Sequence, residues 1–222
     1  MNGQLLPYHL NEEKNWALDA DNVASIIESA KENGIVPRAM VVINPGNPTG
    51  QLMKRENIES IISVCHENEI LIMADEVYQS NIYKEGAEFV SFRKVLSEMG
   101  APYNNETELI SMHSVSKGLM GECGLRGGYM ETKNLSKKAS DMLYKLKSIE
   151  LCSNTPGQLA IHLMVNPPTK GVESNDCIQQ YLNEKATTQD GLKKRALLLT
   201  ECFNAMKQVS CTDIEGAMYA FP

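Results

Sequence analysis

The sequence at residues 39–50 is AMVVINPGNPTG, a short apolar run that stops at a turn containing two prolines and two glycines. Similar apolar runs are ILIMA at residues 70–74 and ELISM at residues 108–112. Between the first two runs, isoleucines and a cysteine recur at helical spacing over residues 58–65. Short apolar runs separated by amphipathic helices are typical of βα units around a buried, mostly parallel sheet. We therefore predict an α/β fold.

The remaining segments are predicted to be mostly helical. The first helix is expected to follow Asp21, interpreted as its N-cap, because apolar residues recur at helical spacing up to Ala30. The composition of residues 216–222 resembles the beginning of a strand. Three further helices are predicted, over residues 136–151, 155–166 and 175–206.

Composition excludes several classes of protein. Of the 222 residues, 42% are hydrophobic, which is enough for one sizeable core and part of a second domain. The formal net charge of −7 argues against nucleic acid and anionic membranes as general partners. The six cysteines form no CxxC pair and match no common zinc spacing, so we predict no metal site and expect a reducing compartment. No apolar run is long enough to span a membrane, and the N-terminus does not resemble a secretory signal.

Polar residues follow each of the three predicted strands. Ligands of open α/β sheets bind outside the carboxyl ends of the strands, so Asn47, Asp75 and Ser114 are expected to converge on one site. A partly buried Asp75 needs a cationic partner, which a protonated pyridine nitrogen or an ordinary arginine would supply. The simpler alternative is a helix N-cap beside a packed Tyr78.

The loop after the third run, residues 114–118, has the sequence SVSKG. Hydroxyls and free backbone N–H groups at a strand end suit a phosphate. A desolvated Lys117 can lose its proton and act as a nucleophile, although a surface lysine in a polar loop is the usual alternative. Arg126 lies among four glycines in residues 121–129, where the backbone can approach a ligand and the guanidinium can clamp a phosphate. The four histidines are interpreted as structural or surface residues.

The order of these motifs resembles that of the fold-type I pyridoxal 5'-phosphate (PLP) enzymes of the aspartate aminotransferase class. The resemblance runs from about Tyr8 to Pro222. At residues 75–79, 116–129 and 216–219 the sequence resembles alanine aminotransferases in particular. The motifs that carry it are NPGNPTG at 44–50, DEVY at 75–78, SVSK at 114–117 and Arg126.

The resemblance implies a three-layer α/β/α large domain with an incomplete, mostly parallel sheet. Residues 1–175 would form the central part of this PLP-binding domain, and residues 176–222 a linking helix and the start of a small domain. Lys117 would carry the cofactor covalently and shuttle a proton to and from the substrate. Asp75 would pair with the protonated pyridine nitrogen and keep the ring an electron sink. The remaining cofactor contacts implied are Asn47 and Tyr78 for the phenolic oxygen, and Ser114, Arg126 and, more weakly, Ser116 for the phosphate.

The implied reaction is amino-group transfer between L-alanine and 2-oxoglutarate, giving pyruvate and L-glutamate. The implied partners are therefore small amino and 2-oxo acids, together with a second copy of the chain in a homodimer. We expect a cytoplasmic protein and leave mitochondrial and peroxisomal forms open. Two alternatives remain, a glutamate:glyoxylate aminotransferase and a non-catalytic fragment of the family. A nucleotide-binding α/β domain is disfavoured because no GxGxxG follows a predicted strand.

The resemblance also leads us to expect that the segment is truncated at both ends. The family's earlier phosphate-binding loop, its ring-stacking aromatic and its C-terminal carboxylate-binding arginine would lie outside it. We therefore expect residues 1–222 alone to have little transaminase activity and low stability.

Overall fold

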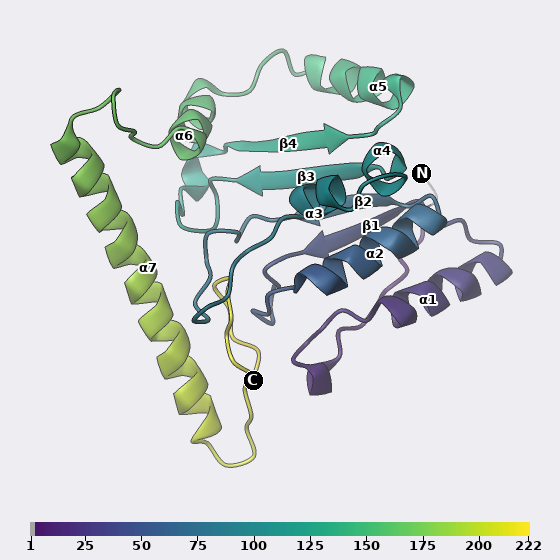
Figure 1. Cartoon of the computed structure of the whole chain (residues 1–222), viewed down its shortest axis with the longest axis horizontal. Helices are drawn as coiled ribbons and strands as arrows, with labels where there is room; N and C mark the ends of the chain where they lie inside the picture. The colour runs from purple at the N-terminus through teal and green to yellow at the C-terminus, as the bar shows by residue number, and fades with distance from the viewer. Residues whose placement is uncertain (1–2) are drawn as a thin grey trace.

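The structure is a computed structural model and describes residues 3–222. It is built around a sheet with helices on one face and a long C-terminal helix across one end (Figure 1). Along the chain, the elements are η1 (Glu12–Lys14), α1 (Ala20–Glu32), β1 (Ala39–Ile43), α2 (Arg55–Glu67), β2 (Leu71–Asp75), α3 (Phe92–Glu98), α4 (Tyr103–Glu106), β3 (Leu109–Ser114), η2 (Cys123–Leu125), β4 (Gly128–Lys133), α5 (Lys137–Ser148), α6 (Thr155–Val165) and α7 (Asn175–Asn204).

The sheet has the strand order β1-β2-β3-β4. Strands β1, β2 and β3 are parallel, and β4 is antiparallel to β3. Ile43 pairs with Asp75, and Asp75 pairs with Met112, so the three parallel strands end side by side. Strand β4 begins at the same edge, where Gly128 pairs with Ser114. The predicted α/β class and mostly parallel sheet are therefore confirmed.

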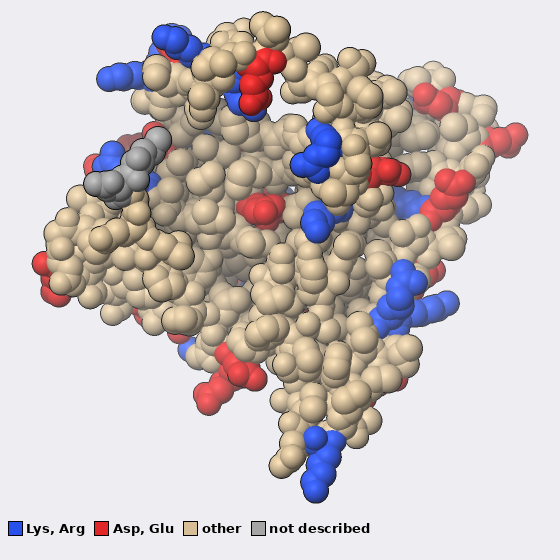
Figure 2. All heavy atoms as spheres, turned by 180° about the vertical axis from the view of Figure 1, so that it is seen from behind, with Lys and Arg blue, Asp and Glu red and all other residues tan. Residues whose placement is uncertain are grey.

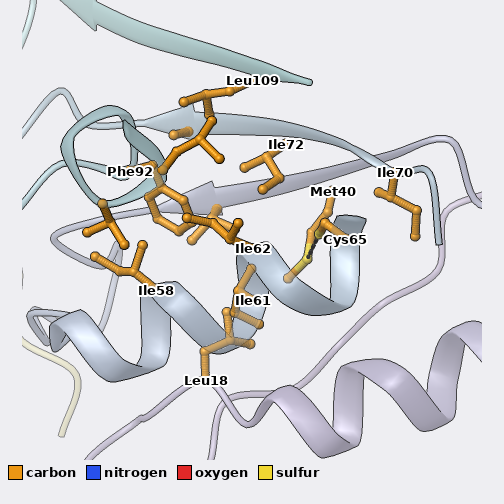
Figure 3. Packing of buried hydrophobic residues seen from close by; sticks show 14 of the residues in the cluster. Leu18, Met40, Ile58, Ile61, Ile62, Cys65, Ile70, Ile72, Phe92 and Leu109 are labelled. Atoms are coloured by element: carbon orange, nitrogen blue, oxygen red, sulfur yellow. Dashed lines mark hydrogen bonds between the residues drawn. The ribbon is translucent and has the colours of Figure 1, made fainter. Parts of the chain in front are cut away.

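The core lies between the sheet and the helices that cover one of its faces. Ile58, Ile62 and Cys65 of α2 point toward the strands, and Ile61 points toward the side of α1 (Figure 3). All four are fully buried, as the helical spacing of apolar residues predicts. Burial of each isoleucine side chain contributes on the order of 1.5–3 kcal/mol to the hydrophobic free energy.

The opposite face of the sheet is much more exposed. Val41, in the middle of β1, keeps 49% of its surface accessible, and Met130 of β4, which the strand register places on the same face, keeps 43%. Seen from this side, residues other than acidic and basic ones make up most of the surface (Figure 2). Residues 3–222 thus contain two of the three predicted layers, the sheet and one helical layer.

Three local predictions need correction. Helix α1 is capped by Asp19, not Asp21, because the Asp19 carboxylate accepts hydrogen bonds from the N–H groups of Asp21 and Asn22. Strand β4 was not predicted, since glycines and charged residues weaken the signal of an edge strand. The predicted strand at residues 216–222 is absent among the described residues, where Gly216 forms only an isolated bridge with Ile82. The predicted helices α2, α5, α6 and α7 are present, each within a few residues of the expected bounds.

Candidate functional site

A cavity of about 340 Å³ opens at the carboxyl ends of the three parallel strands. Each strand contributes its last residue or the residues just after it, because parallel strands in register end at one edge. Five of the seven predicted site residues line this cavity: Asn47, Asp75, Tyr78, Ser114 and Lys117. They come from sequence positions spread over 71 residues, and the strand register brings them together.

Asp75 is the last residue of β2 and is half-buried. Its carboxylate accepts a hydrogen bond from the backbone N–H of Val77 at 3.3 Å. Residues 77–80 form turns and not a helix, so the alternative reading of Asp75 as a helix N-cap is not observed. The carboxylate is left to face the cavity, where it favours a cationic ligand.

Tyr78 lies three residues after Asp75 and is 2% exposed. Its hydroxyl is 2.6 Å from the hydroxyl of Tyr219. Burial raises the pKa of Tyr78, and the Tyr219 hydroxyl and the nearby Asp75 raise it further. Tyr78 is therefore a neutral phenol at physiological pH and can donate a hydrogen bond to a ligand.

Ser114, at the end of β3, and Lys117, in the loop after it, also line the cavity. The hydroxyl of Ser114 donates to the carbonyl of Gly127 at 2.9 Å and accepts from the N–H of Ser116 at 3.0 Å. Its proton is therefore directed at the protein, which weakens the prediction that Ser114 donates to a phosphate. The Lys117 side chain is exposed, so the described residues do not desolvate its amine.

Gly118 brings this loop close to the strand that carries Asp75. It has a φ of +63°, and a Cβ at this position would lie 2.7 Å from the carbonyl oxygen of Val77. A left-handed backbone and this close approach together favour glycine. The packing of Gly118 on Val77 thus sets the position of the adjacent Lys117.

Arg126 and Ser116, the other two predicted site residues, lie next to each other but do not line the cavity. One guanidinium nitrogen of Arg126 is 3.4 Å from the Ser116 hydroxyl and donates to the Cys123 carbonyl at 3.0 Å. The Arg126 carbonyl accepts a hydrogen bond from the Asn154 side chain, which also caps α6. The Arg126 guanidinium and the Ser116 hydroxyl can together bind an anion beside the cavity.

The sequence motifs did not indicate two residues that lie at or near the site, His113 and Tyr219. His113 lines the cavity, although it was interpreted as structural or surface; burial lowers its pKa, and Asp75 opposes this shift. Its place at the end of an apolar run, directly before Ser114, was the available signal. Tyr219 reaches Tyr78 from 141 residues away, and no local pattern could indicate that.

Among the described residues, no other cavity, metal site or membrane-spanning helix adds a second site for the predicted residues. A second cavity, of about 980 Å³, lies along residues 3–8, α1 and β1 and is lined by none of the predicted site residues. Within residues 3–222, no group of three or more His, Cys, Asp and Glu side chains could hold a metal ion. No helix described here has both the length and the apolar character needed to cross a membrane.

A family model and individual relatives all point to aminotransferases. The family described as aminotransferase class I and II matches residues 1–222. A probable mitochondrial alanine aminotransferase of Dictyostelium discoideum is 50% identical over all of this chain and 41% of its own length. Glutamate–glyoxylate aminotransferase 1 of Arabidopsis thaliana is 46% identical over all of this chain and 46% of its own length. The chain therefore spans less than half the length of these curated relatives.

A solved structure supports the same fold. The alanine aminotransferase of Pyrococcus furiosus superimposes with a TM-score of 0.72 and 28% sequence identity. The match covers 96% of this chain and 47% of that one.

Proposed function

Since the chain belongs to the class I and II aminotransferase family, we propose that it forms part of a PLP-dependent enzyme that transfers an amino group between L-alanine and 2-oxoglutarate. The observation that carries the proposal is the cavity in which Asn47, Asp75, Tyr78 and Lys117 meet from three separate strand ends. Relatives named alanine aminotransferase, 42–50% identical to this chain, favour alanine as the amino donor.

The donor and acceptor groups in the cavity fit PLP. When bound, PLP supplies an electron-withdrawing ring that stabilises negative charge developing at the substrate α-carbon. The Asp75 carboxylate would hold a proton on the ring nitrogen, because an adjacent negative charge favours the cationic form. The neutral phenol of Tyr78 and the amide of Asn47 would donate hydrogen bonds to the ring oxygen.

Lys117 would hold the cofactor through its Nζ atom. The same amine, once released, would move a proton to and from the substrate α-carbon, which requires it to stay within reach of the reacting atoms. Gly118 supports this role, since its close packing on Val77 restricts where the Lys117 backbone can lie.

The cofactor phosphate would be bound by Arg126 and Ser116, whose side chains are 3.4 Å apart. Arginine suits a phosphate because its guanidinium donates two parallel hydrogen bonds. Ser114 would act mainly as a support, since its hydroxyl joins the Ser116 N–H to the Gly127 carbonyl.

The first experiment is to add PLP to the purified protein, reduce the complex with borohydride and map the labelled peptide. We expect the label on Lys117. In the Lys117→Ala variant we expect loss of the label, and in the complete enzyme that contains this segment the same substitution should abolish alanine:2-oxoglutarate transamination. Lys137→Ala, at an exposed position of α5, should retain both. A label on another lysine of the wild-type protein would rule out the assignment.

A second candidate, glutamate:glyoxylate transamination, is favoured by the 46% identity to the Arabidopsis enzyme of that name. The cavity residues described above serve both reactions, because they contact the cofactor and not the substrate side chain. Rates with alanine plus 2-oxoglutarate and with glutamate plus glyoxylate, measured on one preparation of the complete enzyme, would separate the two.

We propose that residues 1–175 belong to the large domain and that α7 begins the link to a small domain. A homodimer is supported by exposed apolar side chains on and after α5, including Tyr144 at 80%, Ile149 at 73% and Leu151 at 89% exposure. Light scattering of the purified protein would test the dimer.

A cytoplasmic location is supported by six free cysteines, which suit a reducing compartment.

A further inference from the structure

We infer that Tyr219 is a positioning residue of the cofactor site, whose hydroxyl donates to Tyr78 and so leaves the Tyr78 proton free for a bound ligand. This inference rests on the proposed function and deepens it. It concerns the C-terminal segment, residues 214–219, which none of the sequence motifs linked to the cavity.

The contact between the two tyrosines is close and specific. Their hydroxyl oxygens are 2.6 Å apart, and the rings meet edge to face with centroids 5.6 Å apart and planes at 88°. Tyr78 packs with Val77 and Ala217 in one buried cluster, against which Tyr219 is half-buried. The Tyr78 ring has little freedom to turn its hydroxyl elsewhere, so the hydroxyl of Tyr219 is a fixed partner.

Backbone hydrogen bonds hold Tyr219 in this place. The N–H of Gly216 donates to Gly50 at 2.8 Å, and the N–H of Ala217 donates to Asn81 at 3.0 Å. The Tyr83 hydroxyl donates to the carbonyl of Ala217 at 2.5 Å. The segment is therefore tied both to the turn after β1 and to the loop that follows Tyr78.

A second feature restricts the same segment. A Cβ at Gly216 would lie 2.6 Å from the carbonyl oxygen of Asn81, so the chain passes too close for a side chain at this position. The buried carboxylate of Glu215 accepts a hydrogen bond from the N–H of Leu52 at 2.9 Å and pairs with Lys84. The positions of the residues before Tyr219 are thus determined by several independent contacts.

The chemistry of a phenol gives this contact a direction. A tyrosine hydroxyl has one proton to donate and can also accept. If Tyr78 donates its proton to Tyr219, it has none for a ligand in the cavity. When a ligand oxygen accepts from Tyr78, Tyr219 must become the donor in the 2.6 Å contact. Tyr219 then fills the acceptor site of Tyr78 and, by polarising its O–H bond, strengthens the hydrogen bond to the ligand.

The test compares Tyr219→Phe with wild type in the purified protein, using the dissociation constant of PLP as the readout. We expect binding about fivefold weaker, the usual effect of losing one hydrogen bond. Tyr144→Phe is the matched control, because it removes the same hydroxyl from a side chain that is 80% exposed. Tyr83→Phe controls for loosening of the segment, since its hydroxyl holds Ala217 and not Tyr78.

A double-mutant cycle with Tyr78→Phe distinguishes positioning from a general structural role. If Tyr219 acts through the Tyr78 hydroxyl, Tyr219→Phe should have no further effect on PLP binding once Tyr78 is phenylalanine. Additive effects in this cycle, or a Tyr219→Phe dissociation constant equal to that of wild type, would overturn the inference while leaving the proposed function intact. Failure of the wild-type protein to bind PLP would instead overturn the proposed function, and the inference with it.

Discussion

The buried carboxylate of Glu76 should make the stability of this protein depend on pH in a specific way. Glu76 directly follows Asp75, is 5% exposed, and accepts a hydrogen bond from the N–H of Phe92 at 2.8 Å, at the start of α3. Burial raises its pKa from the ordinary 4.5 to about 7, against the lowering effect of the Phe92 hydrogen bond and with help from the charges of Asp75 and Glu131.

The magnitude and sign of this pH dependence follow from the difference in the pKa of Glu76 between the folded and the unfolded protein. Because the folded-state pKa is the higher one, the folded protein binds the proton more tightly, and this contribution to stability is fully present below about pH 4.5. It is lost as the pH rises through 7, and the difference of 2.5 units corresponds to about 3 kcal/mol. Glu76→Gln keeps an oxygen that can accept from Phe92 but cannot ionise, so it escapes this loss.

The assay is urea unfolding of the cofactor-free protein between pH 4.5 and pH 8. We expect Glu76→Gln to be close to wild type in stability at pH 4.5 and about 3 kcal/mol more stable at pH 8. Glu28→Gln, which removes an exposed carboxylate on α1, serves as the control and should follow the wild-type curve. Parallel stability curves for Glu76→Gln and wild type would show that Glu76 is ionised normally in the folded protein and would refute the reasoning.

Two further substitutions test the packing of the site and of the core. Gly118→Ala should weaken PLP binding by roughly tenfold, because the new Cβ lies 2.7 Å from the Val77 carbonyl and must displace the adjacent cofactor-binding lysine. Gly121→Ala shares the left-handed backbone but has open space around its Cβ, so an equal effect of the two on PLP binding would contradict this explanation. Ile62→Ala should lower the free energy of unfolding by about 2–5 kcal/mol, since Ile62 is fully buried between α2 and the sheet. Leu198→Ala, 58% exposed on α7, should change it by no more than about 0.5 kcal/mol in the same urea titration, and comparable losses would argue against the described core.

Much of the fold follows from local patterns in the sequence. The apolar runs that became β1, β2 and β3 were recognisable because strands buried in a parallel sheet need continuous apolar residues. Helices α1 and α2 were recognisable from apolar residues at helical spacing, because each helix packs only one side against the interior. The general rule that ligands bind at the carboxyl ends of such strands then brought Asn47, Asp75 and Ser114 to one edge of the sheet, and the strand register agrees.

The sequence alone did not determine contacts between distant segments. Strand β4 pairs antiparallel to β3 although its residues are mostly exposed, because an edge strand needs backbone hydrogen bonds more than an apolar pattern. The expected donor role of Ser114 depended on where its hydroxyl points, and the nearby Gly127 carbonyl determines that direction.

Tyr219 illustrates the same limit most clearly. Its local sequence predicted a strand, yet its hydroxyl meets Tyr78 across 141 residues of intervening chain. Helical and strand periodicities arise from interactions within a few turns or residues, so they can be read from short windows of sequence. The meeting of Tyr78 and Tyr219 depends instead on the path of α7 and on the close approach of Gly216 to Asn81, and only the folded chain determines both.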